Sequence, residues 1–382
     1  MKREDILPFL KFGDNLRFIM KKNHVIITLC ALLLIVGALV TVLLLRDSEE
    51  EPIDNLVRYR ANAFSYFDTV SVVEGYAKSE EDFDKVTQQV FAALEEYHKL
   101  FDIYNSYEGI NNLRKINKLY DGEHKVVTVD RKIIDMLLYA KKMYNVTGGE
   151  MNIAMGSVLS IWHDYRAEAD DNYGFGKLPP MDELEEAAKH TNINDLIIDE
   201  ENCTVYLADP QMKLDVGAIA KGYAVEMVAQ MLEQQGITGY VINVGGNIRT
   251  VGVKGNGDKW LAGIEAPSDN FDEPYLAYLG LAGETIVTSG SYQRYYIVDG
   301  KEYHHIIDKD TLMPAKGFLS VSVICQNSAD GDGLSTALFC MSLEDGMALV
   351  ESLEGVEAHW VLEDGTRVKS SGFSNYEVEY NP

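Results

Sequence analysis

A run of small, acidic and hydroxyl residues near the C-terminus offers oxygen atoms of the kind that bind a metal ion or a phosphate. Gly331 and Gly333 permit a sharp turn ahead of an apolar run at residues 334–341, so Asp332 is predicted to cap a helix there. Thr336, four residues later, would share a face with Asp332. A carboxylate and a hydroxyl beside the free N–H groups of a helix start suit a hard cation and a phosphate together. An Asp that only caps an apolar helix explains the same residues.

Two other glycine-bearing segments could bring backbone close to a ligand. In residues 213–226, Asp215 lies just before a predicted helix at residues 219–235, and the glycines of the segment allow close approach. A capping Asp with glycines used only for packing is the simpler explanation. Asn243-Val-Gly-Gly-Asn247 could cradle a phosphate, but its spacing is neither that of a Walker loop nor that of a dinucleotide fingerprint, and it is typical of a hairpin turn.

Two adjacent histidines at residues 304 and 305 offer a base that works near neutral pH. His304 and His305 precede an Ile-Ile-Asp sequence typical of a strand, and Asp308 could orient an imidazole. Neighbouring side chains on a strand point to opposite faces, so only one of the two histidines can face a given site. A metal site made by both is therefore not expected. A histidine that is merely hydrogen-bonded at a strand end is the alternative.

Apolar periodicity and turn residues predict the elements that must position these side chains. Helices are expected at residues 80–101, 131–144, 183–190 and 219–235. Strands are expected at residues 69–76, 196–198, 204–207, 240–244, 248–253, 260–265, 275–282, 295–298, 319–325 and 356–362. No repeat and no second linker interrupts the pattern, so residues 63–382 are predicted to form one mixed α/β unit.

The N-terminal part is predicted to be a membrane anchor. Residues 25–45 carry no charge, and 21 residues at about 1.5 Å each reach across a hydrocarbon core of roughly 30 Å. Six basic residues precede this run, and four acidic residues follow Arg46, which predicts that residues 1–24 are cytoplasmic and that the chain from Asp47 onward is outside the cell membrane. Residues 46–62 are polar and charged and are predicted to be a tether.

A cleaved signal peptide is the main alternative to an anchor. The apolar run is longer than a signal-peptide core of about 7–15 residues, and no small-x-small cleavage site follows it. A lipoprotein is a weaker alternative, because Cys30 lies inside the run and follows the bulky Leu29. We therefore expect a single-pass membrane protein with its main domain outside the cytoplasm.

Composition excludes several classes of protein. A net charge of −26 argues against a nucleic-acid partner, because binding to phosphates needs Lys and Arg to displace counterions. In 382 residues, an apolar content of 46% allows a sizeable core. One of the four cysteines lies in the apolar run, and Cys203, Cys325 and Cys340 are scattered, which favours buried thiols over a disulfide framework or a zinc site.

Taken in order, the motifs resemble those of the ApbE family, flavin transferases that act as FAD:protein FMN transferases. The resemblance covers residues 67–353, and it implies an α+β fold: one mixed flavin-transferase domain with largely antiparallel sheets, here behind a transmembrane helix. Each block is a modest signal, whereas the ordered set is highly specific. The blocks are Phe67-Asp-Thr69, Gly148-Gly-Glu-Met-Asn-Ile-Ala-Met-Gly156 with Leu159 and Trp162, Leu214-Asp-Val-Gly-Ala-Ile-Ala-Lys-Gly-Tyr223, Asn243-Val-Gly-Gly-Asn247, Thr288-Ser-Gly290, His305-Ile-Ile-Asp308 and Asp332-Gly-Leu-Ser-Thr336.

The resemblance also implies where FAD and a metal ion bind. A Mg²⁺ on the diphosphate of FAD would be held by the backbone carbonyl of Ala218 and by the side chains of Asp332 and Thr336. His305 matches the active-site histidine of the family, so the implied catalytic residues are His305 and Asp332. Contacts to the flavin dinucleotide are implied at Phe67, Tyr104, Met151, Asn152, Ile153, Asp215, Lys221 and Ile306.

The chain departs from the family pattern in two loops. Lys309 and Leu312 stand where the family usually has the Pro of an Asp-Pro pair and a Gly before a later Pro. Asn152 and Ala154 stand where Asp and Thr are usual. Because the implied metal ligands are intact, these departures are expected to affect loop shape and pocket detail.

The implied reaction is a phosphoryl transfer in which FMN passes from FAD to a Ser or Thr hydroxyl and AMP leaves. His305 is predicted to take the hydroxyl proton. The implied acceptor is an exported or membrane redox protein that carries an Asp-x-x-(Ser/Thr)-Gly/Ala-Thr sequence. Two alternatives use the same residues. One is a Mg²⁺-dependent FAD pyrophosphatase, in which water replaces the hydroxyl, and the other is a flavin-binding protein without catalysis.

Overall fold

A computed structural model describes residues 55–118, 126–267, 271–292 and 294–380. The elements below all belong to the unit that runs from Pro52 to Glu379. The predicted cytoplasmic segment (1–24) and the predicted anchor (25–45) lie outside the described residues. Within the described ranges, no helix has both the length and the apolar character that a membrane span requires.

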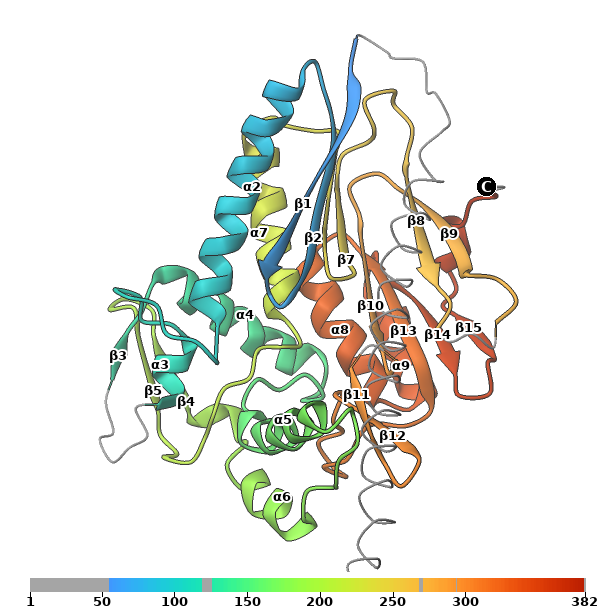
Figure 1. Ribbon diagram of the computed structural model, residues 1–382. Coiled ribbons are helices and arrows are strands. Elements are labelled where there is room, and N and C mark those ends of the chain that lie inside the picture. The colour runs from blue at the N-terminus through green and yellow to red at the C-terminus, as the bar shows by residue number, and fades with distance from the viewer. Residues whose placement is uncertain (1–54, 119–125, 268–270, 293, 381–382) are drawn as a thin grey trace, which may run out of the picture. The chain divides into compact units, whose positions relative to one another are not determined.

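An eight-stranded sheet forms the centre of the fold (Figure 1). The strand order is β1-β2-β6-β7-β10-β13-β14-β15, and every pairing in it is antiparallel, as expected. Because β2 pairs with β6, segments far apart in the sequence lie side by side. The strands are β1 (Val57–Tyr66), β2 (Thr69–Ala77), β6 (Tyr240–Val244), β7 (Asn247–Val251), β10 (Thr285–Gly290), β13 (Phe318–Cys325), β14 (Glu357–Leu362) and β15 (Arg367–Lys369).

Two of the hairpins in this sheet have two-residue turns. β6 and β7 are joined by Gly245 and Gly246, both with positive φ, which confirms the predicted hairpin and matches the needs of a type I′ turn. The turn between β1 and β2 has the same form, but it places Phe67 and Asp68 at φ 53° without the help of glycine.

Three long helices lie against this sheet (Figure 1). α2 (Glu80–Phe101) is capped by the Ser79 side chain, packs on β1 and β2, and reaches α7. α7 (Ala220–Gln234) lies on β6 and β7, and α8 (Ser328–Cys340) lies on β10 and β13. The apolar faces of these elements contribute to the two main buried clusters, and other elements such as α4 add to the larger one. α7 and α8 also pack against each other, and this contact organises the site.

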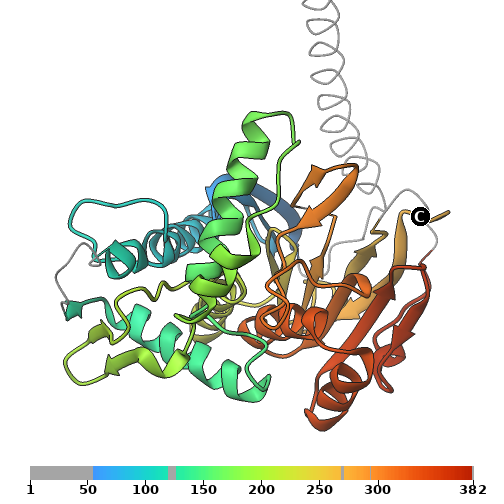
Figure 2. The ribbon, with the colours of Figure 1, turned by 90° about the horizontal axis from the view of Figure 1, so that it is seen from below.

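The remaining elements surround this centre. In Figure 2 the helical region from α2 to α6 lies to one side and the C-terminal strands with α8 and α9 lie to the other. The helices are α3 (Leu113–Lys118), α4 (Arg131–Val146), α5 (Gly156–Asp171), α6 (Met181–Ala188) and α9 (Leu343–Ser352), with short 3₁₀ turns at Ile193–Asp195 and Phe373–Asn375. A three-stranded sheet and two hairpins are formed by β3 (Val127–Thr128), β5 (Thr204–Leu207) and β4 (Leu196–Asp199), by β8 (Trp260–Glu265) and β9 (Tyr275–Leu281), and by β11 (Tyr295–Val298) and β12 (Lys301–His304).

Most predicted elements are present, and one boundary is corrected. The tether predicted at residues 46–62 overlaps β1, whose residues 57–62 pair with β2 and belong to the sheet. The chain there is polar because β1 is an edge strand with many exposed positions. Helix α5 was not predicted, although it carries a site residue. Cys203, Cys325 and Cys340 are free thiols, but only Cys325 is fully buried, whereas Cys203 and Cys340 are partly exposed.

Candidate active site

The starts of α7 and α8 meet and bring together residues that the sequence singles out. The Oδ2 atom of Asp332, on α8, accepts a 2.8 Å hydrogen bond from the backbone N–H of Gly222, in the first turn of α7. That N–H is one of the four at a helix start that have no partner in their own helix. The Nζ atom of Lys221 lies 3.7 Å from Oδ1 of the same carboxylate. Asp332 is only 3% exposed, so this buried charge is met by an amide and an ammonium group.

Gly222 is required for the two helices to come this close. A Cβ atom at this position would stand closer than 3.0 Å to the carbonyl oxygen of Ser328 and to Cβ of Asp332. The glycine therefore serves the close approach that the sequence predicted, and the approaching backbone is that of α8.

Asp332 does not cap α8, contrary to the prediction. The helix begins four residues earlier, at Ser328, and the Asn327 side chain caps it by accepting two N–H groups of the first turn. Asn caps helices as well as Asp does, and the glycines of the segment are accommodated inside the helix. Thr336 still follows Asp332 by one turn on α8, so the predicted shared face is retained.

Ala218 lies just outside α7, beside the same junction. The helix begins at Ala220 with Ile219 as its cap. The Ala218 carbonyl is four residues ahead of Gly222 and would accept that N–H if the helix extended further, but Asp332 accepts it instead. The helix thus makes no use of the Ala218 carbonyl.

Asp332, Thr336 and Ala218 together present a carboxylate, a hydroxyl and a carbonyl, which are the hard oxygen donors that Mg²⁺ prefers. On β10, the Ser289 hydroxyl lies 2.9 Å from the Ser335 hydroxyl and 3.4 Å from that of Thr336. Mg²⁺ commonly combines one or two protein carboxylates with substrate phosphates, and this donor set fits such a shared site. In the part of the chain that the structure describes, no cluster of three or more His, Cys, Asp or Glu residues could hold a metal ion.

A second polar group lies beside the segment that leads into α7. Tyr104 follows α2, its hydroxyl is hydrogen-bonded to Nδ1 of His163 on α5, and the two rings stack with centroids 5.6 Å apart. The Nε2 atom of His163 is 3.8 Å from Oδ2 of Asp215. Asp215 lies five residues ahead of α7 and accepts the Gly217 N–H over 2.8 Å, so it shapes this loop and does not cap the helix. Tyr104 is 52% exposed and presents an open aromatic face.

His305 directly follows β12 and is held by Arg294. Its backbone N–H donates to the Arg294 carbonyl over 3.1 Å, and its Nδ1 atom lies 3.2 Å from the same oxygen. Because a carbonyl can only accept, Nδ1 carries the proton, and Nε2 of the neutral ring is the free acceptor. Burial lowers the pKa of His305 to about 3, and the positive charges of Arg294 and Arg166 add to this effect.

The same two arginines connect His305 with the group around Tyr104. Burial lowers the pKa of His163, the Asp215 carboxylate opposes this shift, and Arg166 and Arg294 add to it. Both histidines are thus close enough to the arginine pair to feel its charge, which indicates that they belong to one region.

His304 and His305 have different partners, as the alternation of strand side chains predicted. Nε2 of His304 lies 2.9 Å from the Ala315 carbonyl, and the ring packs edge-on against Phe339. The predicted role of Asp308 in orienting an imidazole is wrong, because Oδ1 of Asp308 accepts the N–H groups of Asp310 and Thr311 in its own turn. The Arg294 carbonyl orients His305 instead.

The loop after His305 accommodates Lys309 and Leu312, which form one of the two departures from the family pattern. Leu312 adopts a φ of 59°, where a glycine would be free of strain, and its carbonyl accepts the Trp162 indole N–H over 3.0 Å. Nζ of Lys309 pairs with Glu150 over 3.3 Å. Ile306 is buried in the core, and its N–H lies 3.3 Å from Nδ1 of His304.

The other predicted FAD contacts have well-defined surroundings. Met151 and Ile153 are each 1% exposed, and their side chains belong to the core. The Asn152 amide donates to the Thr191 carbonyl and accepts the Ala154 N–H, each over 2.9 Å. The Phe67 N–H donates to Nδ1 of His98 over 3.2 Å. Contacts of these four residues with FAD stay predictions.

Sequence reasoning missed three contributors to the site. The Gly222 N–H carries no signal in a sequence, because only the meeting of two helices reveals its partner. Ser289 lies inside the Thr288-Ser-Gly290 block, which drew attention without assigning a role to its hydroxyl. His163 follows the noted Trp162 and becomes evident only once α5 lies beside Tyr104 and Asp215.

Comparison with known proteins identifies relatives over most of the chain. The model of the ApbE family matches residues 67–360. An FAD:protein FMN transferase of Klebsiella pneumoniae (strain 342) is 31% identical over 291 residues, which are 75% of this chain and 85% of that protein. An FAD:protein FMN transferase of Treponema pallidum (strain Nichols) is 33% identical over 262 residues, 64% of this chain and 69% of that protein.

Solved structures show the same fold. The ApbE protein of Thermotoga maritima MSB8 superimposes with a TM-score of 0.73 at 27% identity and covers 85% of this chain and 100% of its own. The flavin transferase ApbE of Vibrio cholerae has a TM-score of 0.70 at 25% identity, over 84% of this chain and 99% of its own.

Proposed function

This chain belongs to the ApbE family and shares the flavin-transferase activity of its relatives, and from that premise we propose its full reaction. FMN passes from FAD to a Ser or Thr hydroxyl of an exported or membrane redox protein, AMP leaves, and Mg²⁺ is the metal. The observation that carries the proposal is the junction of α7 and α8, where Asp332 accepts the Gly222 N–H. Ala218 and Thr336 flank that contact in the sequence, each within one helical turn of it.

Ala218, Asp332 and Thr336 would hold Mg²⁺ together with the diphosphate of FAD. Bound there, the ion would neutralise phosphate charge and assist the departure of AMP. Lys221 places an ammonium group beside Asp332, and the positive end of the α7 dipole favours an anion. The protein itself thus supplies a positive helix start, a lysine and a carboxylate to orient the diphosphate.

His305 is proposed to accept the proton of the acceptor hydroxyl at Nε2. Its pKa of about 3 keeps the ring neutral at pH 7, so the proton-accepting form is present before the substrates bind. So low a pKa also means a weak base. An anionic diphosphate near Arg294 and Arg166 would offset their charge and raise the pKa of His305, which strengthens the base when FAD is bound.

Tyr104 is proposed to hold a ring of FAD, either the flavin or the adenine. Its exposed face offers stacking, while its hydroxyl is tied to His163, which lies next to Asp215. This chain of contacts fixes the tyrosine ring before a ligand arrives and reduces the entropy lost on binding.

The acceptor and the location of the enzyme are parts of the same proposal. Residues 25–45 would anchor the protein in the cell membrane, with the N-terminus in the cytoplasm and the transferase domain outside. The uncharged 21-residue run and the charge asymmetry around it support this arrangement. An anchored enzyme stays close to membrane acceptors that carry the Ser/Thr flavinylation sequence.

The proposed reaction is tested by its products. The purified full-length protein is incubated with FAD, Mg²⁺ and a candidate acceptor, and the acceptor is examined for in-gel flavin fluorescence while AMP is quantified. Covalent FMN on the acceptor with an equal amount of AMP is expected, and removal of Mg²⁺ with a chelator should abolish both. Free FMN with AMP and no labelled acceptor would indicate a pyrophosphatase. Bound FAD without AMP release over hours would indicate a binding protein.

A further inference from the structure

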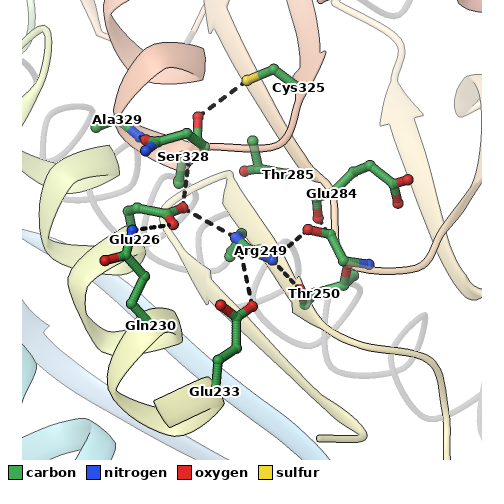
Figure 3. Close-up of polar contacts among 12 residues, drawn as sticks. Glu226, Gln230, Glu233, Arg249, Thr250, Glu284, Thr285, Cys325, Ser328 and Ala329 are labelled. Atoms are coloured by element: carbon green, nitrogen blue, oxygen red, sulfur yellow. Dashed lines mark hydrogen bonds and ion pairs between the residues drawn. The ribbon is translucent and has the colours of Figure 1, made fainter. Parts of the chain in front are cut away.

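A buried carboxylate joins α7 to the start of α8, one turn away from the junction at Asp332. Glu226, on α7, is 3% exposed, and its Oε2 atom accepts the backbone N–H of Ser328 over 2.9 Å (Figure 3). Ser328 is the first residue of α8, so its N–H is another helix-start donor without a partner in its own helix. Gln230 donates to the second oxygen of Glu226 over 2.9 Å.

Arg249, on β7, holds this carboxylate in place. Its Nε atom donates to Oε2 of Glu226 over 3.1 Å, and its Nη2 atom pairs with Glu233 over 3.0 Å. Its Nη1 atom donates to the carbonyl of Thr250 (Figure 3) and to that of Gly283. At 5% exposure, a charged guanidinium is tolerated only because these partners satisfy it. The network fixes Glu226 against both the sheet and α8.

The two contacts between α7 and α8 are reciprocal. Glu226 of α7 accepts an N–H at the start of α8, and Asp332 of α8 accepts an N–H at the start of α7. Each pair of positions is four residues apart, Gly222 and Glu226 on one helix and Ser328 and Asp332 on the other, which is about one turn. The two contacts therefore lie one turn apart along the same helix–helix interface, and a shift of either helix along its axis would break both.

We infer that Glu226 is a positioning residue for Asp332: with Arg249 behind it, it holds α8 at the register in which the Asp332 carboxylate stands at the start of α7. This inference rests on the proposed function, because it concerns the metal ligand of that site. Glu226 itself touches neither substrate nor metal. Partners that orient a ligand from behind usually tune metal affinity, and their loss weakens it by about 10–100-fold.

Glu233 provides a matched control for Glu226. Both carboxylates lie on α7 and pair with Arg249. The Glu233 side chain is 42% exposed, and among the described residues it pairs with Arg249 alone, whereas Glu226 also accepts an N–H of α8. Glu226→Gln and Glu233→Gln thus each remove one negative charge from Arg249, and only the first weakens the contact with α8.

The test measures metal binding without turnover. Free Mn²⁺ is followed by electron paramagnetic resonance as it is titrated into the full-length protein with FAD and without an acceptor. Glu226→Gln is expected to weaken Mn²⁺ binding at least about 10-fold, while Glu233→Gln stays within about twofold of wild type. The rate of FMN transfer at saturating metal should change much less in Glu226→Gln than the Mn²⁺ affinity does.

Three results are decisive. The positioning role is overturned if Glu226→Gln and Glu233→Gln bind Mn²⁺ with equal affinity and both show a cooperative thermal unfolding transition, which establishes that they are folded. If Glu226→Gln does not fold, Glu226→Asp is measured in its place. This variant keeps the negative charge that Arg249 needs, but its side chain is one methylene shorter, so the carboxylate moves away from the Ser328 N–H. Mn²⁺ affinity at the wild-type level in Glu226→Asp again overturns the inference, and a loss of about 10-fold supports it. A wild-type protein that binds no Mn²⁺ with FAD contradicts the proposed metal site and, with it, the premise of this inference.

Discussion

The Asp332 carboxylate can be altered without removing its hydrogen bond to α7. Asp332→Asn keeps an oxygen for the Gly222 N–H but loses the negative charge. We expect kcat/KM for FAD to fall by about 10²–10³, because the loss of one group that stabilises transition-state charge has this effect. The measurement is the rate of covalent FMN incorporation across a Mg²⁺ titration.

Asp330 is the control for this change. It lies on the same helix but accepts the Tyr139 hydroxyl over 2.7 Å and has no role in the proposed site. Asp330→Asn should stay within a few-fold of the wild-type rate. A wild-type rate in Asp332→Asn at limiting Mg²⁺ would remove Asp332 from the ligand set.

The low pKa of His305 predicts how kcat/KM depends on pH. The pKa of about 3 in the FAD-free protein means that the base form persists as the pH falls from 8 to 5. The pH profile of kcat/KM for FAD reports the titrating groups of the FAD-free enzyme. This profile should therefore show no acid limb from His305 in this range. His305→Gln should lower kcat by about 10² at every pH tested. An acid limb near pH 6.5 that disappears in His305→Gln would show that the free histidine titrates normally.

At the scale of elements, the α7–α8 contact depends on the absence of a side chain at residue 222. Gly222→Ala adds a methyl group that would stand closer than 3.0 Å to backbone of α8, so the helices must separate. We expect a loss of about 1–3 kcal/mol in the free energy of unfolding, as in other overpacked sites, although Ala is about 1 kcal/mol better than Gly in a helix. Urea unfolding measures the loss.

Gly333→Ala separates this steric effect from helix propensity. Gly333 lies inside α8, and a Cβ there would meet the flexible end of Met143 at 3.2 Å. This variant should be neutral or stabilised by up to about 1 kcal/mol. If Gly222→Ala were equally stable, the two helices would not be in the close contact that the site requires.

The C-terminal strands contain a histidine that is expected to make the fold sensitive to acid. His359, on β14, is 1% exposed and stacks on Phe373, and burial lowers its pKa to about 4, assisted by Lys369 and Arg367. Its folded pKa is below the unfolded value of about 6.5, so the unfolded chain takes up the proton first. Stability is therefore full above pH 6.5 and is lost as the pH falls from 6.5 to 4, by up to about 3 kcal/mol.

His359→Leu should remove this dependence. Neither ring nitrogen has a hydrogen-bond partner among the described residues, so an apolar side chain of similar volume costs little at pH 7. Unfolding measured at several pH values should give a flatter curve between pH 7 and 4 for the variant. An unchanged slope would mean that other groups cause the acid sensitivity.

At the scale of the whole molecule, local patterns predicted most elements but not their order in the sheet. α2 was predicted with both of its boundaries, because a Ser cap, acidic first-turn residues and a regular apolar period agree there. The β6–β7 hairpin followed from two glycines. That β6 would pair with β2, far away in the chain, could not be predicted, because no local pattern encodes a long-range pairing.

Errors arose where a residue has more than one local role. Both Asn327 and Asp332 can cap a helix. Because α8 starts at Ser328, Asn327 is its cap, and the Asp332 carboxylate is left to accept the Gly222 N–H of α7. Residues 57–62 of β1 were assigned to the tether because an edge strand with exposed positions has a polar sequence. The motifs identified the candidate site, whereas its internal contacts, such as the Gly222 N–H and His163, depend on how the helices meet.

The proposed reaction depends on a divalent ion that Ala218, Asp332 and Thr336 hold on the diphosphate of FAD at the junction of α7 and α8. The most direct test is a crystal structure of the protein with FAD and Mn²⁺, in which anomalous scattering locates the metal. We expect one Mn²⁺ bound by the Ala218 carbonyl, the Asp332 carboxylate, the Thr336 hydroxyl and phosphate oxygens of FAD. An FAD diphosphate bound elsewhere, or Mn²⁺ absent from this junction while FAD is present, would contradict this expectation.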